Sequence, residues 1–98
     1  VLWNARYSDE LIYPNPSAGE VSIGFSTERA GRLGLSIFDE KGKLVRRLLD
    51  GQPVAAGDFQ IVWDGRDGGG RPAPSGVYFY QIVDGEGGKR SGRLVLAR

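Results

Sequence analysis

Apolar and polar residues alternate along most of this chain with a period of two. In the clearest run, Val21, Ile23 and Phe25 are separated by serine and glycine. Because successive side chains of a β-strand point to opposite faces, this spacing predicts strands with one face on a core and one face nearer to water. The same alternation joins Leu33, Leu35 and Ile37, and again Phe59, Ile61 and Trp63.

Three other segments fit strands of different kinds. Residues 76–84 are almost continuously apolar or aromatic, so we expect a central strand that is covered on both sides. Residues 93–97 predict a strand that closes the chain. Residues 11–13 predict a short opening strand that ends at Pro14-Asn15-Pro16, since neither proline can donate to a ladder of hydrogen bonds.

Residues 43–50 have an ambiguous pattern. Leu44, Val45, Leu48 and Leu49 follow the spacing of a helical stripe. A helix confined between the two flanking glycines would be short, however, and every neighbouring segment has the period of a strand. We therefore predict a strand here as well.

Turn residues separate these segments. Residues 39–42, between two apolar runs and ending in glycine, predict a hairpin, whereas residues 64–75 are too irregular for a strand or a helix. Seven short strands in about 100 residues indicate an all-β, immunoglobulin-like β-sandwich of about seven antiparallel strands. We assign turn or structural roles to Pro14, Asn15, Pro16, Gly42, Asp64, Gly65, Asp67 and Gly76, and core positions to Val21, Ile23, Phe25, Leu35, Ile37, Phe59, Ile61, Trp63, Tyr78, Tyr80 and Ile82.

The composition indicates one small domain without a reactive centre. The chain has 98 residues, and a folded chain of this size buries about 64% of its unfolded surface, which is enough for one core. It contains no histidine and no cysteine. The commonest general base, the best nucleophile and the main zinc and copper ligands are therefore absent from the chain. We expect no enzymatic activity, no cofactor and no metal, although hydrolysis by two carboxylates stays formally open.

Charge and length limit the partners. A net charge of +1 predicts no strong field for nucleic acid or anionic lipid, and no apolar run approaches the roughly 18 residues that span a bilayer. Because the chain starts at Val1 rather than Met, we expect a processed piece of a longer protein. We predict an Ig-like domain over residues 10–98, preceded by a linker or docking arm over residues 1–9.

Several short motifs follow one another in a fixed order from Tyr13 onward. This ordered set resembles the Ig-like domain of the flagellar hook-capping protein and the C-terminal sorting domains of the type IX secretion pathway in Gram-negative bacteria. The motifs are Tyr13-Pro14-Asn15-Pro16, Gly31, Ile37-Phe38-Asp39, Gly42-Lys43-Leu44-Val45, Val62-Trp63-Asp64-Gly65-Arg66-Asp67 and Pro74-Ser75-Gly76-Val77-Tyr78-Phe79-Tyr80.

The resemblance implies a non-catalytic module at the C-terminus of an exported bacterial protein, acting in secretion sorting or cell-surface attachment. It implies an extracellular or cell-surface location in a Gram-negative bacterium. Its partners would be the outer-membrane secretion machinery or neighbouring domains and subunits of the same surface protein. Residues 89–98 look like the true end of such a sorting domain. The alternative is a structural or adhesion module that joins subunits by strand addition or arm docking.

Asp64 and Asp67 lie in a glycine-rich segment that invites a calcium interpretation. The EF-hand spacing needs acids at the third, fifth and twelfth positions, where this chain has Arg66, Gly68 and Ser75. We interpret the segment as a tight crossing between strands, in which the carboxylates accept backbone N–H bonds or pair with Arg66. Ion binding by the two aspartates is the alternative.

Surface residues suggest places for a partner. The resemblance puts Tyr78 and Tyr80 inward, so Phe79 points outward and is either half covered by its neighbours or part of a docking patch. Positive charge concentrates on residues 46–47 and 89–98. It forms a basic stripe if these strands are neighbours, and otherwise protects sheet edges against aggregation. The candidate partner-binding residues are Leu2, Trp3, Phe79, Arg90 and Arg93, and the charged residues are Arg46, Arg47, Lys89, Arg90, Arg93 and Arg98.

Overall fold

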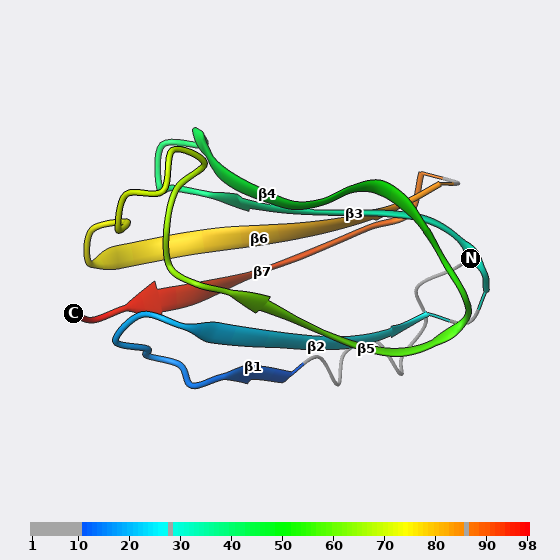
Figure 1. Cartoon of the computed structure of the whole chain (residues 1–98), viewed down its shortest axis with the longest axis horizontal. Coiled ribbons are helices and arrows are strands. Elements are labelled where there is room, and N and C mark those ends of the chain that lie inside the picture. Colours follow the sequence, from blue (N-terminus) through cyan, green and yellow to red (C-terminus); the bar gives the residue numbers. More distant parts are fainter. Residues whose placement is uncertain (1–10, 28, 86) are drawn as a thin grey trace.

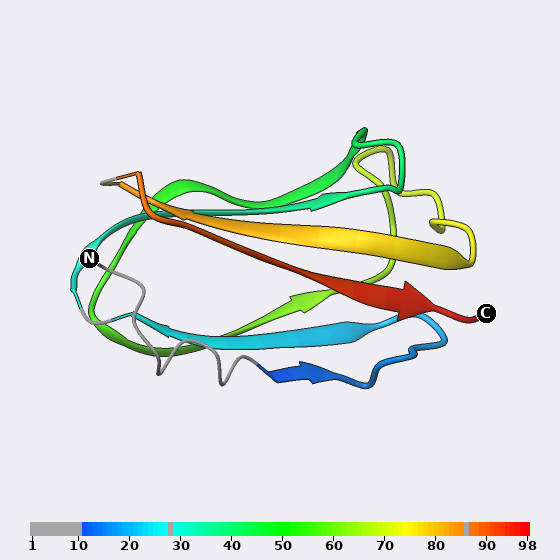
Figure 2. The same cartoon turned by 180° about the vertical axis from the view of Figure 1, so that it is seen from behind.

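Two antiparallel sheets packed face to face make up the domain (Figure 1 and Figure 2). The computed structural model describes residues 11–27, 29–85 and 87–98, so the predicted arm over residues 1–9 lies outside the described residues. The described residues include no helix with the length and apolar character needed to cross a membrane. The two facing antiparallel sheets confirm the predicted all-β, Ig-like sandwich. Its strands are β1 (Leu11–Tyr13), β2 (Val21–Thr27), β3 (Gly31–Phe38), β4 (Leu44–Val54), β5 (Gly57–Trp63), β6 (Gly76–Asp84) and β7 (Lys89–Leu96).

The order of the strands decides which of them lie at the edges. One sheet has the order β1-β2-β5 and the other β4-β3-β6-β7. Strands β2, β3 and β6 present alternate side chains to the other sheet. The buried apolar core consists of Val21, Ile23, Phe25, Leu33, Leu35, Ile37, Trp63, Ala73, Tyr78, Tyr80, Ile82, Leu94 and Leu96.

Trp63 anchors one end of this core. Its side chain is completely buried, and its ring meets Tyr78 edge-on with 5.5 Å between ring centroids. Its indole Nε1–H donates to the carbonyl of Arg66 at 2.9 Å, so the buried polar atom has a partner. Two residues that we assigned to the core, Phe59 and Ile61, are only half-buried, because among the described strands β5 has a neighbour on one side alone.

Strand β6 is central in its sheet, but the expectation that it is covered on both sides is wrong. Tyr78, Tyr80 and Ile82 face the core, whereas Phe79 on the other face is 40% exposed. No described element packs over the outer face of this sheet. The apolar residues of this strand therefore divide between a core face and a surface face.

Strand β4 explains the ambiguous pattern of residues 43–50. It pairs with β3 through three irregularities, at which Val45, Leu48 and Gly51 have no partner residue in β3. Each extra residue shifts the strand's alternation by one position, so its apolar residues no longer follow a period of two. Gly51 adopts a φ of +70°, which glycine accepts at little steric cost. The predicted strand is present and extends to Val54.

The segment after β1 closes one side of the sandwich. Whereas β1 pairs with β2, the backbone of Ser17 exchanges hydrogen bonds with β7: its N–H donates to Val95 at 2.9 Å, and its carbonyl accepts from Ala97 at 2.7 Å. The Asn15 side-chain oxygen accepts from the Val95 amide at 3.0 Å. The proline-rich turn thus carries the chain from one sheet to the other.

Gly92 lies against the buried ring of Tyr80, where the structure leaves no room for a side chain. A Cβ at this position would lie 2.6 Å from Cζ of Tyr80, whose ring is 4% exposed. We expect Gly92→Ala to lower the free energy of unfolding by about 1–3 kcal/mol in a urea titration, because the ring would have to move within a packed core. Gly34→Ala is the matched control, since its Cβ would meet nothing closer than 3.6 Å. Equal losses in the two variants would contradict the prediction.

Candidate functional site

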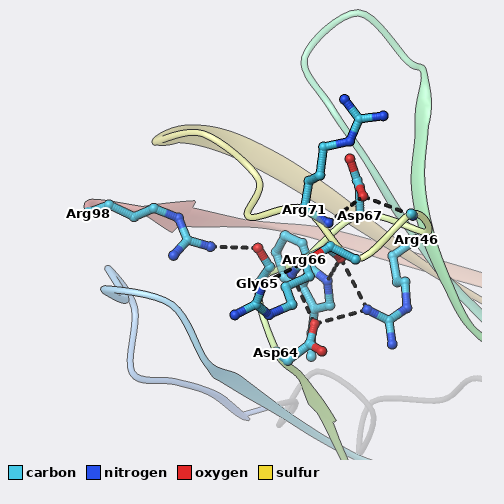
Figure 3. A network of polar contacts seen from close by, with 10 residues as sticks. Arg46, Asp64, Gly65, Arg66, Asp67, Arg71 and Arg98 are labelled. Atoms are coloured by element: carbon cyan, nitrogen blue, oxygen red, sulfur yellow. Dashed lines mark hydrogen bonds and ion pairs between the residues drawn. The ribbon is translucent and has the colours of Figure 1, made fainter.

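The segment between β5 and β6 is a loop held in place by its own carboxylates (Figure 3). The Oδ1 atom of Asp64 accepts the Arg66 amide at 3.0 Å and forms an ion pair with Nη1 of Arg46 at 2.9 Å. Arg66 does not pair with Asp64 through its side chain; its guanidinium donates to the carbonyl of Gly70 at 2.9 Å. The cation beside Asp64 therefore comes from β4, and this pair ties the loop to that edge strand.

Asp67 organises the second turn of the loop. Its Oδ1 accepts the amides of Gly69 at 2.9 Å and Arg71 at 3.0 Å. These hydrogen bonds, led by the one from Arg71, lower the pKa of Asp67 below its ordinary value. In the described part of the chain, no group of three or more acidic, histidine or cysteine side chains could hold a metal ion. Both carboxylates thus have a structural use in the loop.

Arg98 locks this loop from the end of β7, a role that we did not foresee from the sequence. Its Nε donates to the carbonyl of Ala73 at 2.6 Å. Figure 3 shows its second contact, in which Nη2 donates to the carbonyl of Gly65 at 2.5 Å. Its backbone amide donates to Ser75 Oγ at 2.9 Å. The acceptors are mostly backbone carbonyls, which every residue has, so no sequence motif marks this contact.

The predicted basic stripe does not form. Strands β4 and β7 are the opposite edges of the four-stranded sheet, so residues 46–47 and 89–98 do not lie side by side. On β7 itself, Arg93 is paired with the outward Phe79 and Arg90 with the inward Ile82. The two arginines that we grouped as partner-binding residues therefore belong to different faces of the strand.

The outer face of the four-stranded sheet bears a row of apolar side chains. Phe38 on β3 is paired with Leu44 on β4 and with Phe79 on β6. Leu44 is 41% exposed and Phe79 40%, whereas Phe38 is half-buried. In a second row beside it, Val77 on β6 is paired with Val95 on β7, and both side chains are half-buried. We call this surface, made of Phe38, Leu44, Val77, Phe79 and Val95, the outer-face patch.

A groove of about 410 Å³ continues from the patch to the loop end of the sandwich. The β3–β4 hairpin forms one wall and the start of β6 the other, with Leu44 and Val77 shared between the groove and the patch. Tyr78 also lines the groove and donates its hydroxyl to the carbonyl of Pro74 at 2.6 Å. Burial, aided by the nearby Asp39 carboxylate, raises the pKa of Tyr78, so its phenol stays a hydrogen-bond donor.

These positions account for the candidate partner-binding residues. Phe79 is exposed within the outer-face patch, and Arg93 lies next to it in the register of β6 and β7. Arg90 faces the other way. Leu2 and Trp3 lie outside the described residues. The structure therefore brings together one aromatic and one cation of the predicted set, and it adds Leu44 and Phe38 to them.

Comparison with known proteins identifies relatives of this fold. PorU of Porphyromonas gingivalis, solved as a latent dimer, has a TM-score of 0.69 at 20% identity over 90% of this chain and 9% of PorU. PorZ is an essential surface component of the type IX secretion system of the same bacterium. It has a TM-score of 0.65 at 23% identity over 96% of this chain and 12% of PorZ. FlgD of P. aeruginosa has a TM-score of 0.63 at 19% identity over 94% of this chain and 75% of FlgD.

These similarities show a shared fold, and this chain spans only a small part of PorU and PorZ. No curated protein is significantly similar to the chain. The sequence profile of the FlgD Ig-like domain, however, matches residues 11–88, from β1 to the turn before β7. The matched region contains the loop between β5 and β6 and most of the outer-face patch. This chain therefore belongs to the FlgD Ig-like domain family.

Proposed function

We propose that residues 10–98 form a non-catalytic module at the C-terminal end of an exported bacterial protein, where the module acts in secretion sorting or cell-surface attachment. Membership of the FlgD Ig-like domain family supports the structural character of the module. The fold shared with PorU and PorZ supports a location at the surface of a Gram-negative bacterium, since PorZ is itself a surface component of type IX secretion.

The observation that carries the proposal is the outer-face patch. Two large apolar side chains, Leu44 and Phe79, are 41% and 40% exposed on a sheet face that no described element covers. Removing apolar surface from water contributes about 25 cal/mol for each Å², from which the costs of association are subtracted. Arg93 at the rim of the patch can add a charged contact. We propose that the secretion machinery, or a neighbouring domain of the same surface protein, docks here.

An export assay tests this function. A periplasmic reporter is fused in front of residues 1–98 and expressed in a bacterium that has a type IX secretion system. We expect the reporter at the cell surface or in the medium, and we expect the same reporter without the domain to stay in the periplasm. Retention of the fusion in the periplasm, with the domain folded, would refute the sorting role.

Two matched substitutions test the patch. Phe79→Lys places a charge at the centre of the patch, and we expect export to fall several-fold because docking would bury that charge. Val62→Lys is the control: Val62 is 48% exposed but lies on β5, in the other sheet, and we expect its export to be unchanged. Thermal unfolding of both variants checks that they fold. Equal export of the two variants would show that the partner docks elsewhere.

A further inference from the structure

Strand β5 differs from the other edge strands of the described chain. β1 has only three residues and runs into a proline-rich turn. β4 is irregular, and the amide of Gly68 covers its outer edge by donating to the Val45 carbonyl at 2.9 Å. The backbone of Ser17 covers the last part of β7. These are the ways in which proteins prevent one sheet edge from pairing with another.

β5 carries none of these protections. Its seven residues pair with β2 alone and in one continuous register, from Val21 opposite Trp63 to Thr27 opposite Gly57. The strand contains no proline, lysine or arginine. Its one charged residue, Asp58, accepts a hydrogen bond from the Ser26 hydroxyl. The side of its backbone that faces away from β2 is therefore a regular edge, suited to pairing with another strand.

The side chains of β5 also leave apolar area uncovered. Phe59 and Ile61 point toward the core but are only half-buried, because no strand of the described residues lies beyond them. Val62, on the outer face, is 48% exposed. A further strand along this edge would shield all three side chains, and it would also give partners to the outward backbone groups.

We propose that β5 pairs antiparallel with β5 of a second copy of this chain, about a two-fold axis at Gln60. In this register Gln60 meets Gln60 of the second copy, Phe59 meets Ile61, and Asp58 meets Val62. No two like charges are opposite each other, since the single carboxylate faces an aliphatic side chain. The pairing is self-complementary and closes both edges at once, merging the two three-stranded sheets into one.

This inference goes beyond the proposed function and is independent of it. The outer-face patch belongs to the four-stranded sheet, whereas β5 belongs to the three-stranded one. A dimer paired through β5 therefore leaves both copies of the patch uncovered. Failure of export in the reporter assay says nothing about β5, and a monomeric domain says nothing about the patch.

A charge-swap experiment tests the pairing and its register. Gln60 is exposed, so Gln60→Lys and Gln60→Glu should fold like the original chain. By sedimentation equilibrium over a range of concentrations, we expect the original chain to dimerise and each variant alone to dimerise about fivefold more weakly, because like charges face each other. An equal mixture of the two variants should regain the original affinity or exceed it.

Cross-linking provides a second measurement, since the chain has no cysteine of its own. Under oxidation, Gln60→Cys should give a disulfide-linked dimer, because the two new thiols face each other across the axis. Asp58→Cys is the register control and should give little disulfide-linked dimer, since its thiol faces Val62 rather than a second thiol. An original chain that is monomeric at every concentration, a mixture no tighter than the single variants, or equal cross-linking at both positions would overturn the proposal.

Discussion

Trp63→Ala should lower the free energy of unfolding by about 3–5 kcal/mol, the usual range for removing a large aromatic side chain from a core. The ring is completely buried, contacts Tyr78 edge-on and donates its indole N–H to Arg66 in the loop. A domain of this size has about 5–15 kcal/mol of stability in total, so the variant should retain only part of it. Urea titration followed by circular dichroism measures the loss.

The adjacent residue provides the control for Trp63. Val62 is 48% exposed and points to the other side of β5, so Val62→Ala should change the stability by no more than about 0.5 kcal/mol. The comparison separates the loss of core packing from any effect on the strand itself. If the two substitutions cost the same, Trp63 does not anchor the core.

Gly65→Ala should lower the free energy of unfolding by about 2–5 kcal/mol. Gly65 has a φ of +76°, a left-handed conformation that costs a residue with a Cβ about 1–2 kcal/mol. In addition, the new Cβ would lie 2.6 Å from the carbonyl oxygen of Gly19 and 2.7 Å from Nη2 of Arg98. Overpacking of this kind adds about 1–3 kcal/mol. A thermal melt should show a decrease of at least about 8 °C.

Gly42→Ala separates the two causes. Gly42 has a similar φ of +83°, but nothing lies within 4 Å of the position its Cβ would take. It should therefore show the conformational loss of about 1–2 kcal/mol without the crowding. The difference between the two variants measures how tightly Gly19 and Arg98 close around the loop. If the loss of unfolding free energy at Gly65 is no larger than that at Gly42, the loop shifts to accommodate the new Cβ without a measurable cost.

The two proposals use different parts of one sandwich. The outer-face patch lies on the four-stranded sheet and the open edge on the three-stranded sheet, as the order of the strands shows. The loop between β5 and β6 lies at one end and is fastened from both outer strands of the four-stranded sheet, by Arg46 and by Arg98. The loop thus connects β5 of one sheet to β6 of the other and is tied down on both sides.

The sequence by itself determined the strands, most of the buried residues and the class of fold. Alternation with a period of two shows which side of a strand is inward, and it does so for Ile23, Leu35 and Ile37 without knowledge of any neighbour. The hairpin over residues 39–42 could also be predicted from local sequence, because its turn needs a glycine, Gly42, at a positive φ. These features depend on residues close together in the chain, and a single sequence displays them directly.

Only the tertiary structure decided which strands are neighbours and what lies beyond each face. The irregular pairing of β4 is defined by the partner strand β3, so it left only a confusing pattern in the sequence. The exposure of Phe79, the separation of the two basic segments and the contact of Arg98 with the loop all depend on strand order. Alternation records that a side chain points outward; whether another layer, a second strand or water meets it there is fixed by contacts between residues far apart in the chain.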